Sequence, residues 1–369
     1  MLKFSQRINA ITSKDTVLLR VDFNLSKDRQ GQFVLSHRFY SMIPVIKQIV
    51  AKGCSVIVVS HLGRPKAGGV DKAYSFSSLV PELSKALDFP VSFLPGWPHQ
   101  KTFLAPGTVA MAENTRFLLG ETKNDPNLVG KMLNGVSTVV MEAFACSHRK
   151  HASTVGIASQ VSRLVLGPCH RQEIYAIDRF RHFSGQRMAV VAGKKITTKL
   201  ALLEQMVAKM NVLCLGGGIA NTLLHSQGYQ LGGSFVEYSQ LRAAQVLYDL
   251  AKQHEVKLIL PQDVVVCENL QDNHTMRVTD IDHIEPQEFI IDVGPKTVAA
   301  FVAELAFVQS VYWNGPLGIY EHESGMGAST AWAQALSSSK AYTLLGGGDT
   351  LSVLENLGYK GFTHVSMGG

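Results

Sequence analysis

Short apolar runs rich in β-branched residues alternate along the chain with segments of helical periodicity. Strands are predicted at residues 16–23, 55–62, 108–115, 137–144, 188–193, 211–218, 257–264, 310–317 and 341–348. Between them, stretches such as residues 41–53 and 198–210 carry apolar residues three and four positions apart, which predicts helices. Continuous apolar strands indicate burial on both faces, and strand–helix alternation is typical of parallel sheets. The fold class predicted is therefore α/β with doubly wound parallel sheets.

The length of the chain and one polar segment predict two domains. A chain of 369 residues is too long for one hydrophobic core of ordinary size. Residues 167–185 begin with Gly-Pro, end near Ser-Gly and carry a charged stretch of helical character between them. We expect this segment to be a linker helix with a hinge. It would join two Rossmann-like domains, residues 1–166 and residues 186–369.

The charge of the chain is divided unevenly between its halves. Residues 1–185 hold 23 Lys and Arg against 12 Asp and Glu, whereas residues 186–369 hold 12 against 17. A basic half fits either a nucleic acid or a small, highly anionic substrate. The positions of the basic residues must decide between these partners.

The remaining composition indicates a cytoplasmic protein. The five cysteines are scattered and form no CxxC pair, which is typical of reduced thiols and not of a disulfide framework. The first residues contain no apolar segment ahead of a cleavage site, so we expect no secretory signal. The longest apolar runs are too short to cross a bilayer, so no membrane partner is expected.

Basic and polar residues of the first half cluster where the predicted strands end. Carboxyl ends of parallel strands form the ligand edge of such sheets, and guanidinium groups suit phosphate and carboxylate. No aromatic residues are interleaved with them, so we expect a small anion and no nucleic acid. The candidate substrate-binding residues are Arg20, Asp22, Asn24, Arg38, His61, Arg64, Arg116, His148, Arg149 and His151.

Two glycine triplets in the second half, residues 216–218 and 346–348, each follow a strand and precede a helix. Such a turn admits phosphate close to the backbone, although glycines at turns are often only structural. Asp349 would lie at a helix start, as a ligand of Mg²⁺ or as a plain helix cap. Walker A and GxGxxG patterns are absent, so a standard P-loop or dehydrogenase site is not predicted.

Two lysines and two further polar residues complete this candidate nucleotide site. Lys195 and Lys199 are four residues apart after a strand, which predicts that they share one face of a starting helix. They would hold an anion there or form a solvated surface pair. Asn314 is a candidate donor, and Glu321 could accept from ribose hydroxyls.

At these positions the sequence resembles the phosphoglycerate kinase family. The matching segments occur in family order: LLRVDFN, SHLGRPK, ENTRF, AFACSHRKHAST, KKITTK, CLGGGIANT, LPQDVVV, DVGPKT, YWNGPLGIYE, LLGGGDT and HVSMGG. The resemblance implies reversible phosphoryl transfer between 1,3-bisphosphoglycerate and ADP, giving 3-phosphoglycerate and ATP. It also implies Mg²⁺ and a monomer whose two domains close like a hinge.

The resemblance assigns roles residue by residue. The triose set falls on Asp22, Asn24, Arg38, His61, Arg64, Arg116 and Arg149, with Arg20, His148 and His151 completing the basic patch. The nucleotide set falls on Lys195, Lys199, Gly216, Gly217, Gly218, Asn314, Pro316, Glu321, Gly346, Gly347, Gly348, Asp349 and Thr350, with the metal on Asp349. Lys195 and Arg38 are the implied catalytic residues. The implied nucleophile is a substrate carboxylate, so no general base is needed.

Some segments depart from the family pattern. The family's GGAK reads Ala-Gly-Lys-Lys at residues 192–195, and its NDAFGTAH reads MEAFACSH at residues 141–148. The family also continues beyond the motif at residues 366–369, so we expect a tail outside the given sequence. A catalytically silent paralogue of the same fold is the main alternative, and a dehydrogenase is disfavoured by the missing glycine fingerprint. Cys146 is either a thiol activated by nearby cations or a small buried apolar residue.

Overall fold

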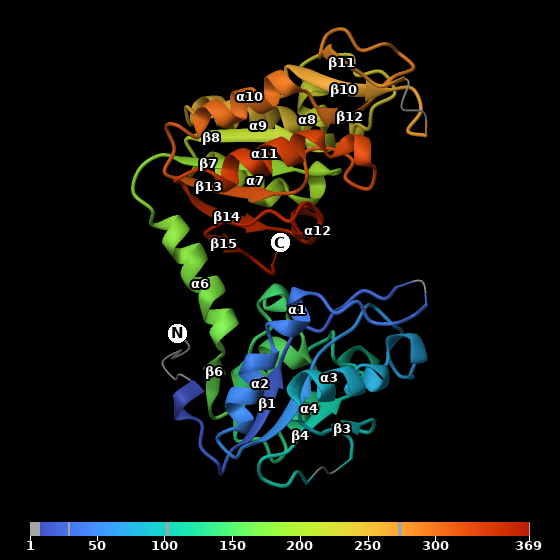
Figure 1. Ribbon diagram of the computed structural model, residues 1–369, viewed down its shortest axis with the longest axis vertical. Coiled ribbons are helices and arrows are strands. Elements are labelled where there is room, and N and C mark those ends of the chain that lie inside the picture. The colour runs from blue at the N-terminus through green and yellow to red at the C-terminus, as the bar shows by residue number, and fades with distance from the viewer. Residues whose placement is uncertain (1–7, 29, 101–102, 272–274, 369) are drawn as a thin grey trace. The chain divides into compact units, whose positions relative to one another are not determined.

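The structure, a computed structural model, describes residues 8–28, 30–100, 103–271 and 275–368. It divides into two compact units, Met1–Tyr175 and Ala176–Gly369, and the boundary lies inside helix α6 (Pro168–Arg181). Each unit has a parallel sheet with helices packed on it (Figure 1). The predicted two-sheet α/β class is confirmed, whereas the hinge role of α6 stays a prediction. No helix within the described residues is both long and apolar enough to span a bilayer.

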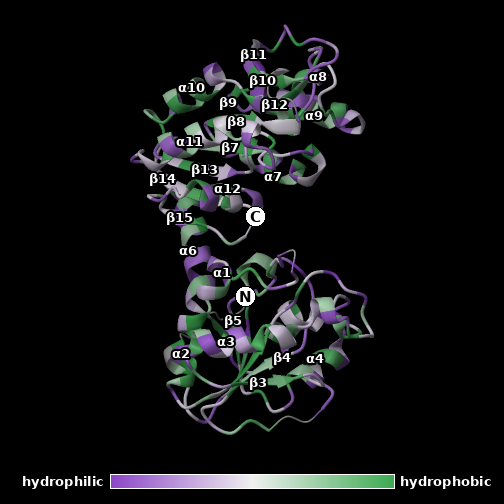
Figure 2. Ribbon diagram, turned by 45° about the vertical axis from the view of Figure 1, so that its right-hand side comes forward, coloured by the Kyte–Doolittle hydropathy of each residue, from purple (hydrophilic) through white to green (hydrophobic). Residues whose placement is uncertain are grey.

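The sheet of the first unit has the order β3-β4-β2-β1-β5-β6, and every neighbouring pair is parallel. Its strands are β1 (Thr16–Arg20), β2 (Ser55–Val59), β3 (Val91–Leu94), β4 (Val109–Ala112), β5 (Thr138–Met141) and β6 (Leu164–Leu166). Its helices, before α6, are α1 (His37–Tyr40), α2 (Ile43–Val50), α3 (Val80–Leu87), α4 (Pro126–Met132) and α5 (Ile157–Gln160). Strands β3 and β4 are largely hydrophobic (Figure 2). Strands β4, β2, β1 and β5 are neighbours in this parallel sheet. The carboxyl ends of these four strands, which are separated in sequence, therefore lie at one edge of the sheet.

The main sheet of the second unit has the order β15-β14-β13-β7-β8-β9 and is also parallel. Its strands are β7 (Arg187–Ala192), β8 (Val212–Gly216), β9 (Lys257–Ile259), β13 (Ser310–Asn314), β14 (Tyr342–Gly346) and β15 (His364–Val365). The helices are α7 (Leu200–Val207), α8 (Gly217–Ser226), α9 (Leu241–Gln253), α10 (Pro295–Glu304), α11 (Gly327–Ser337) and α12 (Gly348–Leu357). A second, antiparallel sheet has the order β11 (Arg277–Asp280), β10 (Asp263–Cys267), β12 (Phe289–Val293).

Strand β7 shows why its sequence is apolar throughout. Ala189 and Val191 point to one face, where they pack in a core with α7, α8 and α9. Met188, Val190 and Ala192 point to the other face, where they pack with α10 and α11. All five side chains are buried, as expected for a parallel strand covered on both faces.

One predicted strand is divided in the structure, and a proline explains the division. The strand predicted at residues 257–264 ends at Ile259, and β10 then begins at Asp263 in the antiparallel sheet. Pro261 lies between them and has no N–H for a strand ladder. Pro44 likewise separates α1 from α2, because in one continuous helix its ring would collide with the carbonyl oxygen four residues earlier.

Candidate active site

The cationic residues of the first unit lie where its parallel strands end. Arg20 is the last residue of β1, and His61 lies two residues beyond β2. Arg116 lies in a 3₁₀ turn that follows β4, and Arg149 lies in the loop after β5. Contacts join Arg20 and Arg149 to His61, and Arg116 lies near enough for the charges of Arg20 and Arg149 to act on it.

Arg20 is the fixed centre of this cluster. Only 1% of its surface is exposed. Its Nε donates to Ser153 Oγ at 3.2 Å, and its Nη1 donates to the carbonyl oxygen of Val21. Its Nη2 lies 3.2 Å from His61 Nδ1 and 3.5 Å from Cys146 Sγ. The guanidinium is therefore held rigidly by groups that carry no full negative charge.

His61 lies between two guanidinium groups. Its Nδ1 faces Arg20, and its Nε2 lies 3.3 Å from Arg149 Nη1. Burial, and then the positive charges of Arg20, Arg116 and Arg149, lower the pKa of His61 to about 2, so the ring is neutral near pH 7. A neutral imidazole has one N–H and one acceptor nitrogen. Only one of the two guanidinium contacts can therefore be a hydrogen bond. In the other contact an N–H of the guanidinium faces the N–H of the imidazole.

Asp22 organises the loop beside this cluster. Its Oδ2 lies 3.3 Å from Nη1 of Arg38, at the start of α1. Its Oδ1 accepts from the backbone N–H of Asn24 at 3.3 Å, and the side-chain oxygen of Asn24 accepts from the Gly63 N–H at 2.8 Å. The carboxylate thus orients one arginine and shapes the loop.

The remaining predicted residues differ in exposure. Arg116 is half-buried, and its Nε is buried with no hydrogen-bond partner among the described residues. His151 is half-buried, and burial together with the charges of Arg116 and Arg149 lowers its pKa to about 4. Arg64 and His148 are exposed.

These contacts give the first unit the chemistry of an anion site. A buried donor that has no acceptor costs stability, and like charges held together cost more. A phosphate or carboxylate placed among these groups would accept from the unpaired donors and neutralise the charges. The geometry therefore favours a small, multiply charged anion.

Cys146 belongs to this cluster as a buried residue. Its exposed surface is 2%, and its thiol donates to the Ala143 carbonyl oxygen at 3.4 Å. Burial raises the pKa of the thiol despite the nearby charges of Arg20 and Arg149. Of the two interpretations of Cys146, its burial favours a small buried residue over an activated thiol.

The second unit contains a cavity of about 620 Å³. It is lined by predicted nucleotide residues and by apolar side chains of β10 and β12. The predicted residues that line it are Lys195, Lys199, Gly217, Gly218, Pro316, Glu321 and Asp349. Its mixture of an apolar wall, lysines and carboxylates suits a ligand with one apolar part and one anionic part.

Lys195 and Lys199 do not share the face of a helix, so this prediction is wrong. Lys195 is extended (φ −120°, ψ 127°) and precedes a 3₁₀ turn, Ile196–Thr198, and Lys199 follows the turn before α7 begins at Leu200. The turn leaves the side chain of Lys195 exposed and that of Lys199 half-buried. Lys195 is exposed, and among the described residues its ammonium has no hydrogen-bond partner.

Lys199 is held inside the cavity wall. Its Nζ donates to the carbonyl oxygens of Ala192 at 2.6 Å and Asn314 at 3.1 Å, and to the side-chain oxygen of Asn314. These acceptors account for the three N–H groups of an ammonium. Burial lowers the pKa of Lys199 to about 8, although the charge of Asp349 opposes this effect. Asn314 itself is buried and positions the lysine instead of lining the cavity.

The two glycine triplets lie at helix starts, as predicted, and only one of them lines the cavity. Gly217 has φ +62°, and a Cβ on Gly218 would lie 2.2 Å from the carbonyl oxygen of Lys194. A larger residue cannot occupy either position without strain. Gly346 ends β14, Gly347 is the N-cap of α12, and Gly348 is the first residue of that helix.

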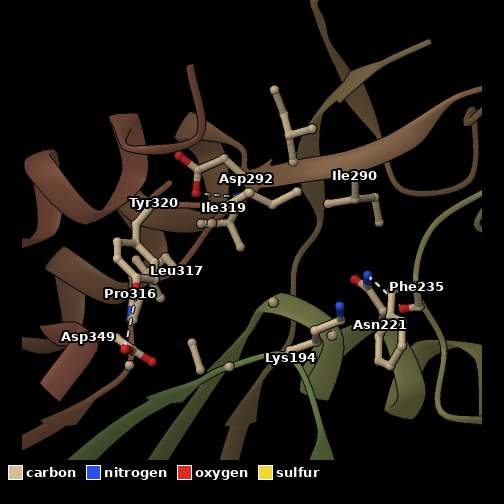
Figure 3. A pocket seen from close by; sticks show the side chains of 18 of the residues that line it. Lys194, Asn221, Phe235, Ile290, Asp292, Pro316, Leu317, Ile319, Tyr320 and Asp349 are labelled. Carbon is tan, nitrogen blue, oxygen red and sulfur yellow. Dashed lines mark hydrogen bonds between the residues drawn. The ribbon is translucent and has the colours of Figure 1, made fainter. Parts of the chain in front are cut away.

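Asp349 lies in the first turn of α12, where Gly347 and not Asp349 is the N-cap. Its Oδ1 accepts from the hydroxyl of Tyr320 at 3.1 Å. Thr350 is buried, and its hydroxyl accepts from the Gly315 N–H and donates to Gly346. Asp349 therefore faces the cavity (Figure 3), and Thr350 stabilises the turn behind it.

Asp349 fits a metal that arrives with its ligand. Mg²⁺ takes oxygen ligands and is often held by one or two carboxylates together with substrate phosphates. Within the described residues no group of three or more His, Cys, Asp or Glu could hold a metal by itself. Among the described residues the Oδ2 atom of Asp349 accepts no hydrogen bond, so the donor set beside the cavity is that of a metal–phosphate complex.

Most of the residues that line the cavity were not predicted from the sequence, and three of them form one group. Lys194, Asn221 and Phe235 lie together in the cavity wall (Figure 3). Lys194 Nζ lies 5.3 Å from the centre of the Phe235 ring, and Asn221 Nδ2 donates to the Phe235 carbonyl oxygen at 3.2 Å. The sequence marked Lys194 only as a departure from the family, and it gave no signal for Phe235, because most phenylalanines are core residues.

Comparisons with known proteins agree with this arrangement. The family model described as phosphoglycerate kinase matches residues 8–369. The phosphoglycerate kinase of Desulfovibrio desulfuricans is 37% identical over 96% of this chain and 91% of its own length. The phosphoglycerate kinase of Coxiella burnetii is 36% identical over 92% of this chain and 86% of its own length.

Solved structures give the same result. The structure of the Coxiella burnetii phosphoglycerate kinase has a TM-score of 0.88 at 35% identity, covering 99% of this chain and 94% of that one. The phosphoglycerate kinase of Pyrococcus horikoshii has a TM-score of 0.81 at 26% identity, over 98% and 93% of the chains. Nothing in these matches supports a silent paralogue. The chain belongs to the phosphoglycerate kinase family, whose members transfer a phosphoryl group reversibly between ATP and the carboxyl group of 3-phosphoglycerate.

Proposed function

We propose that the basic cluster of the first unit binds 3-phosphoglycerate or 1,3-bisphosphoglycerate, and that the cavity of the second unit binds magnesium ATP or ADP. The observation that carries this proposal is the cluster around Arg20 and His61. There two guanidinium groups face one neutral imidazole, and the Nε of Arg116 has no acceptor among the described residues, so an anion would complete the hydrogen bonds. We further propose that the protein acts as a cytoplasmic monomer.

Residues of the first unit would bind and orient the triose. Arg20 and Arg149 present guanidinium groups on either side of the neutral His61, and Arg116 offers a further donor. Asp22 fixes Arg38, which would face the transferred phosphoryl group. Arg64 and His148, both exposed, would meet the ligand from the rim.

Residues of the second unit would hold the nucleotide. Lys199 and Asp349 line the cavity. The positive charge of Lys199 would attract the phosphates, and Asp349 would bind the metal ion that accompanies them. The apolar wall and the turn at residues 216–218 suit a purine base, and Glu321 suits the ribose hydroxyls. When bound, Mg²⁺ would neutralise phosphate charge.

Lys195 and Arg38 would stabilise the phosphoryl group during transfer. In the direction of ATP use, a carboxylate oxygen of 3-phosphoglycerate attacks the γ-phosphorus, and the bond to the β-phosphate oxygen breaks. The carboxylate is already ionised near pH 7, so positioning and charge neutralisation carry the catalysis. Lys195, exposed and without a hydrogen bond to its ammonium within the described part of the chain, can meet the moving charge.

Transfer requires the two sites to meet, because reacting atoms must approach to about 3–3.5 Å. The sites belong to different units, and cations on both repel one another until anions bind. We expect the radius of gyration from small-angle scattering to be smallest with both substrates bound. The forward scattering should give the mass of a monomer. A ligand-free protein as compact as the ternary complex would rule out closure by a hinge.

Nucleotide binding should depend on the protonation of Lys199. The pKa of this lysine is about 8, and an anionic phosphate beside it favours the charged form and so raises the pKa in the complex. Binding between about pH 8 and 9 should therefore take up a proton, and affinity should fall as the pH rises through 8. Calorimetry of ADP binding in two buffers of different ionisation enthalpy measures this uptake.

Lys199→Arg is the matched control for that measurement. Arginine keeps its charge throughout this range, so the variant should bind without proton uptake attributable to this position. Equal proton uptake by both proteins would show that another group titrates.

A further inference from the structure

The turn between Lys195 and Lys199 is held on its outer side by one glutamate. Glu237 precedes the 3₁₀ turn Tyr238–Gln240 and faces the turn Ile196–Thr198. We propose that Glu237 is a positioning residue for the transfer reaction, which acts by holding the turn that carries Lys195. This inference rests on the proposed role of Lys195.

The turn has little internal stability. It is a three-residue 3₁₀ turn, closed by the Lys199 N–H donating to the Ile196 carbonyl oxygen at 2.9 Å. The hydroxyl of Thr198 adds one bond to the Lys195 carbonyl oxygen at 2.8 Å. Ile196 anchors the inner side in the core, where it is fully buried. Short 3₁₀ turns have poor hydrogen-bond geometry, so the outer side needs another anchor.

Glu237 provides that anchor with both carboxylate oxygens. Its Oε2 accepts from the backbone N–H of Thr197 at 3.2 Å, and its Oε1 accepts from the hydroxyl of the same residue. These bonds, together with the positive charge of Lys195, lower the pKa of Glu237, so the carboxylate is ionised near pH 7. Two acceptors on one residue fix both the position and the orientation of the turn.

The backbone of Glu237 is itself tied to the nucleotide side of the cavity. Its N–H donates to Thr222 Oγ1 at 3.2 Å, and that hydroxyl donates to the Gly218 carbonyl oxygen at 2.7 Å. Gly218 lies in the first turn of α8 and lines the cavity. A chain of hydrogen bonds therefore runs from Gly218 through Thr222 and Glu237 to Thr197. It sets the distance between the glycine turn and the lysine turn.

This series of hydrogen bonds affects the reaction because the side chain of Lys195 has, in the described part of the chain, no hydrogen bond that would fix its own position. Among the described residues its ammonium makes no hydrogen bond, so its reach depends on where the turn holds its backbone. A misplacement of about 1 Å can cost an enzyme roughly 10²-fold in rate. Loss of the Glu237 contacts should therefore affect the transfer step more than binding of the triose on the other unit.

The test compares three substitutions that separate geometry from charge. Glu237→Ala removes both contacts, and we expect kcat to fall about 10- to 100-fold. Glu237→Gln keeps an acceptor for the Thr197 N–H and a partner for its hydroxyl, so kcat should stay within about threefold. Glu237→Asp keeps the charge but is one methylene shorter, so it should behave more like Ala. The KM for 3-phosphoglycerate should change little in all three.

Glu204→Ala is the matched control, because Glu204 is exposed on α7 of the same unit and has no hydrogen-bond partner among the described residues. A normal kcat in Glu237→Ala would overturn the proposal. The reverse ranking, with Asp active and Gln impaired, would overturn it in favour of a charge effect. Lys195→Ala separates the two hypotheses. If that variant is impaired while Glu237→Ala is normal, only the positioning role fails, and if Lys195→Ala is normal, the role of Lys195 fails first.

Discussion

Lys195→Ala is expected to lower kcat about 10²- to 10³-fold, the usual cost of removing one group that stabilises transition-state charge. Its KM for either substrate should change much less, because an interaction made only in the transition state does not contribute to ground-state binding. The physical reason is that Lys195 is exposed at the cavity and has no hydrogen-bond partner among the described residues. Steady-state kinetics with 3-phosphoglycerate and ATP measures both constants.

Lys194→Ala provides the comparison for that experiment. Lys194 carries the same charge one position earlier, but its ammonium lies over the ring of Phe235. A normal kcat in Lys195→Ala, accompanied by a large loss in Lys194→Ala, would move the catalytic role to the neighbouring lysine. Loss of catalysis in Lys195→Ala alone would assign it to the residue that the family motif indicates.

Asp349→Asn is expected to weaken binding of magnesium ADP about 10- to 100-fold, the cost of losing one charged oxygen contact. Binding of ADP without Mg²⁺ should be unchanged or tighter, because the substitution removes a negative charge that faces the phosphates. Calorimetric titrations of ADP with and without Mg²⁺ give the two affinities. The difference between them should nearly vanish in the variant.

Titration of 3-phosphoglycerate is the control, since its proposed site lies on the other unit. Affinity for this ligand should not change. Equal loss of both ligands would mean that Asp349 supports the fold of α12 and does not bind the metal.

The sequence predicted the parallel sheets because their strands are apolar throughout, as in residues 188–192. It did not predict the antiparallel sheet β11-β10-β12. Strand β10 follows β9 after only a short break at Pro261, and its apolar residues Val264 and Val266 continue the same pattern. Periodicity cannot show that a chain has passed into another sheet.

The site was predicted unevenly for a similar reason. Arg20 and His61 were found because they lie at or just beyond the ends of neighbouring strands, and topology brings such ends together. The roles of Asn314 and Thr350 behind the cavity were not found, because a motif names residue types and not the direction in which a side chain points. Glu237 has no signal in sequence at all, since its partner Thr197 lies 40 residues away. Contacts of this kind depend on how loops meet after the sheet has formed.

Lys199 and Lys195 lose their side-chain conformational entropy at different stages, the first on folding and the second on ligand binding. Both ends of Lys199 are fixed when the protein folds, since its ammonium already bridges the carbonyl oxygens at the ends of β7 and β13. Ordering a lysine side chain costs up to about 2 kcal/mol, and for Lys199 this loss is complete before any nucleotide arrives. Lys195 keeps its rotamers until the phosphoryl group is in place. Lys199 is therefore preorganised for the nucleotide, whereas Lys195 loses its conformational entropy only when the phosphoryl group is transferred.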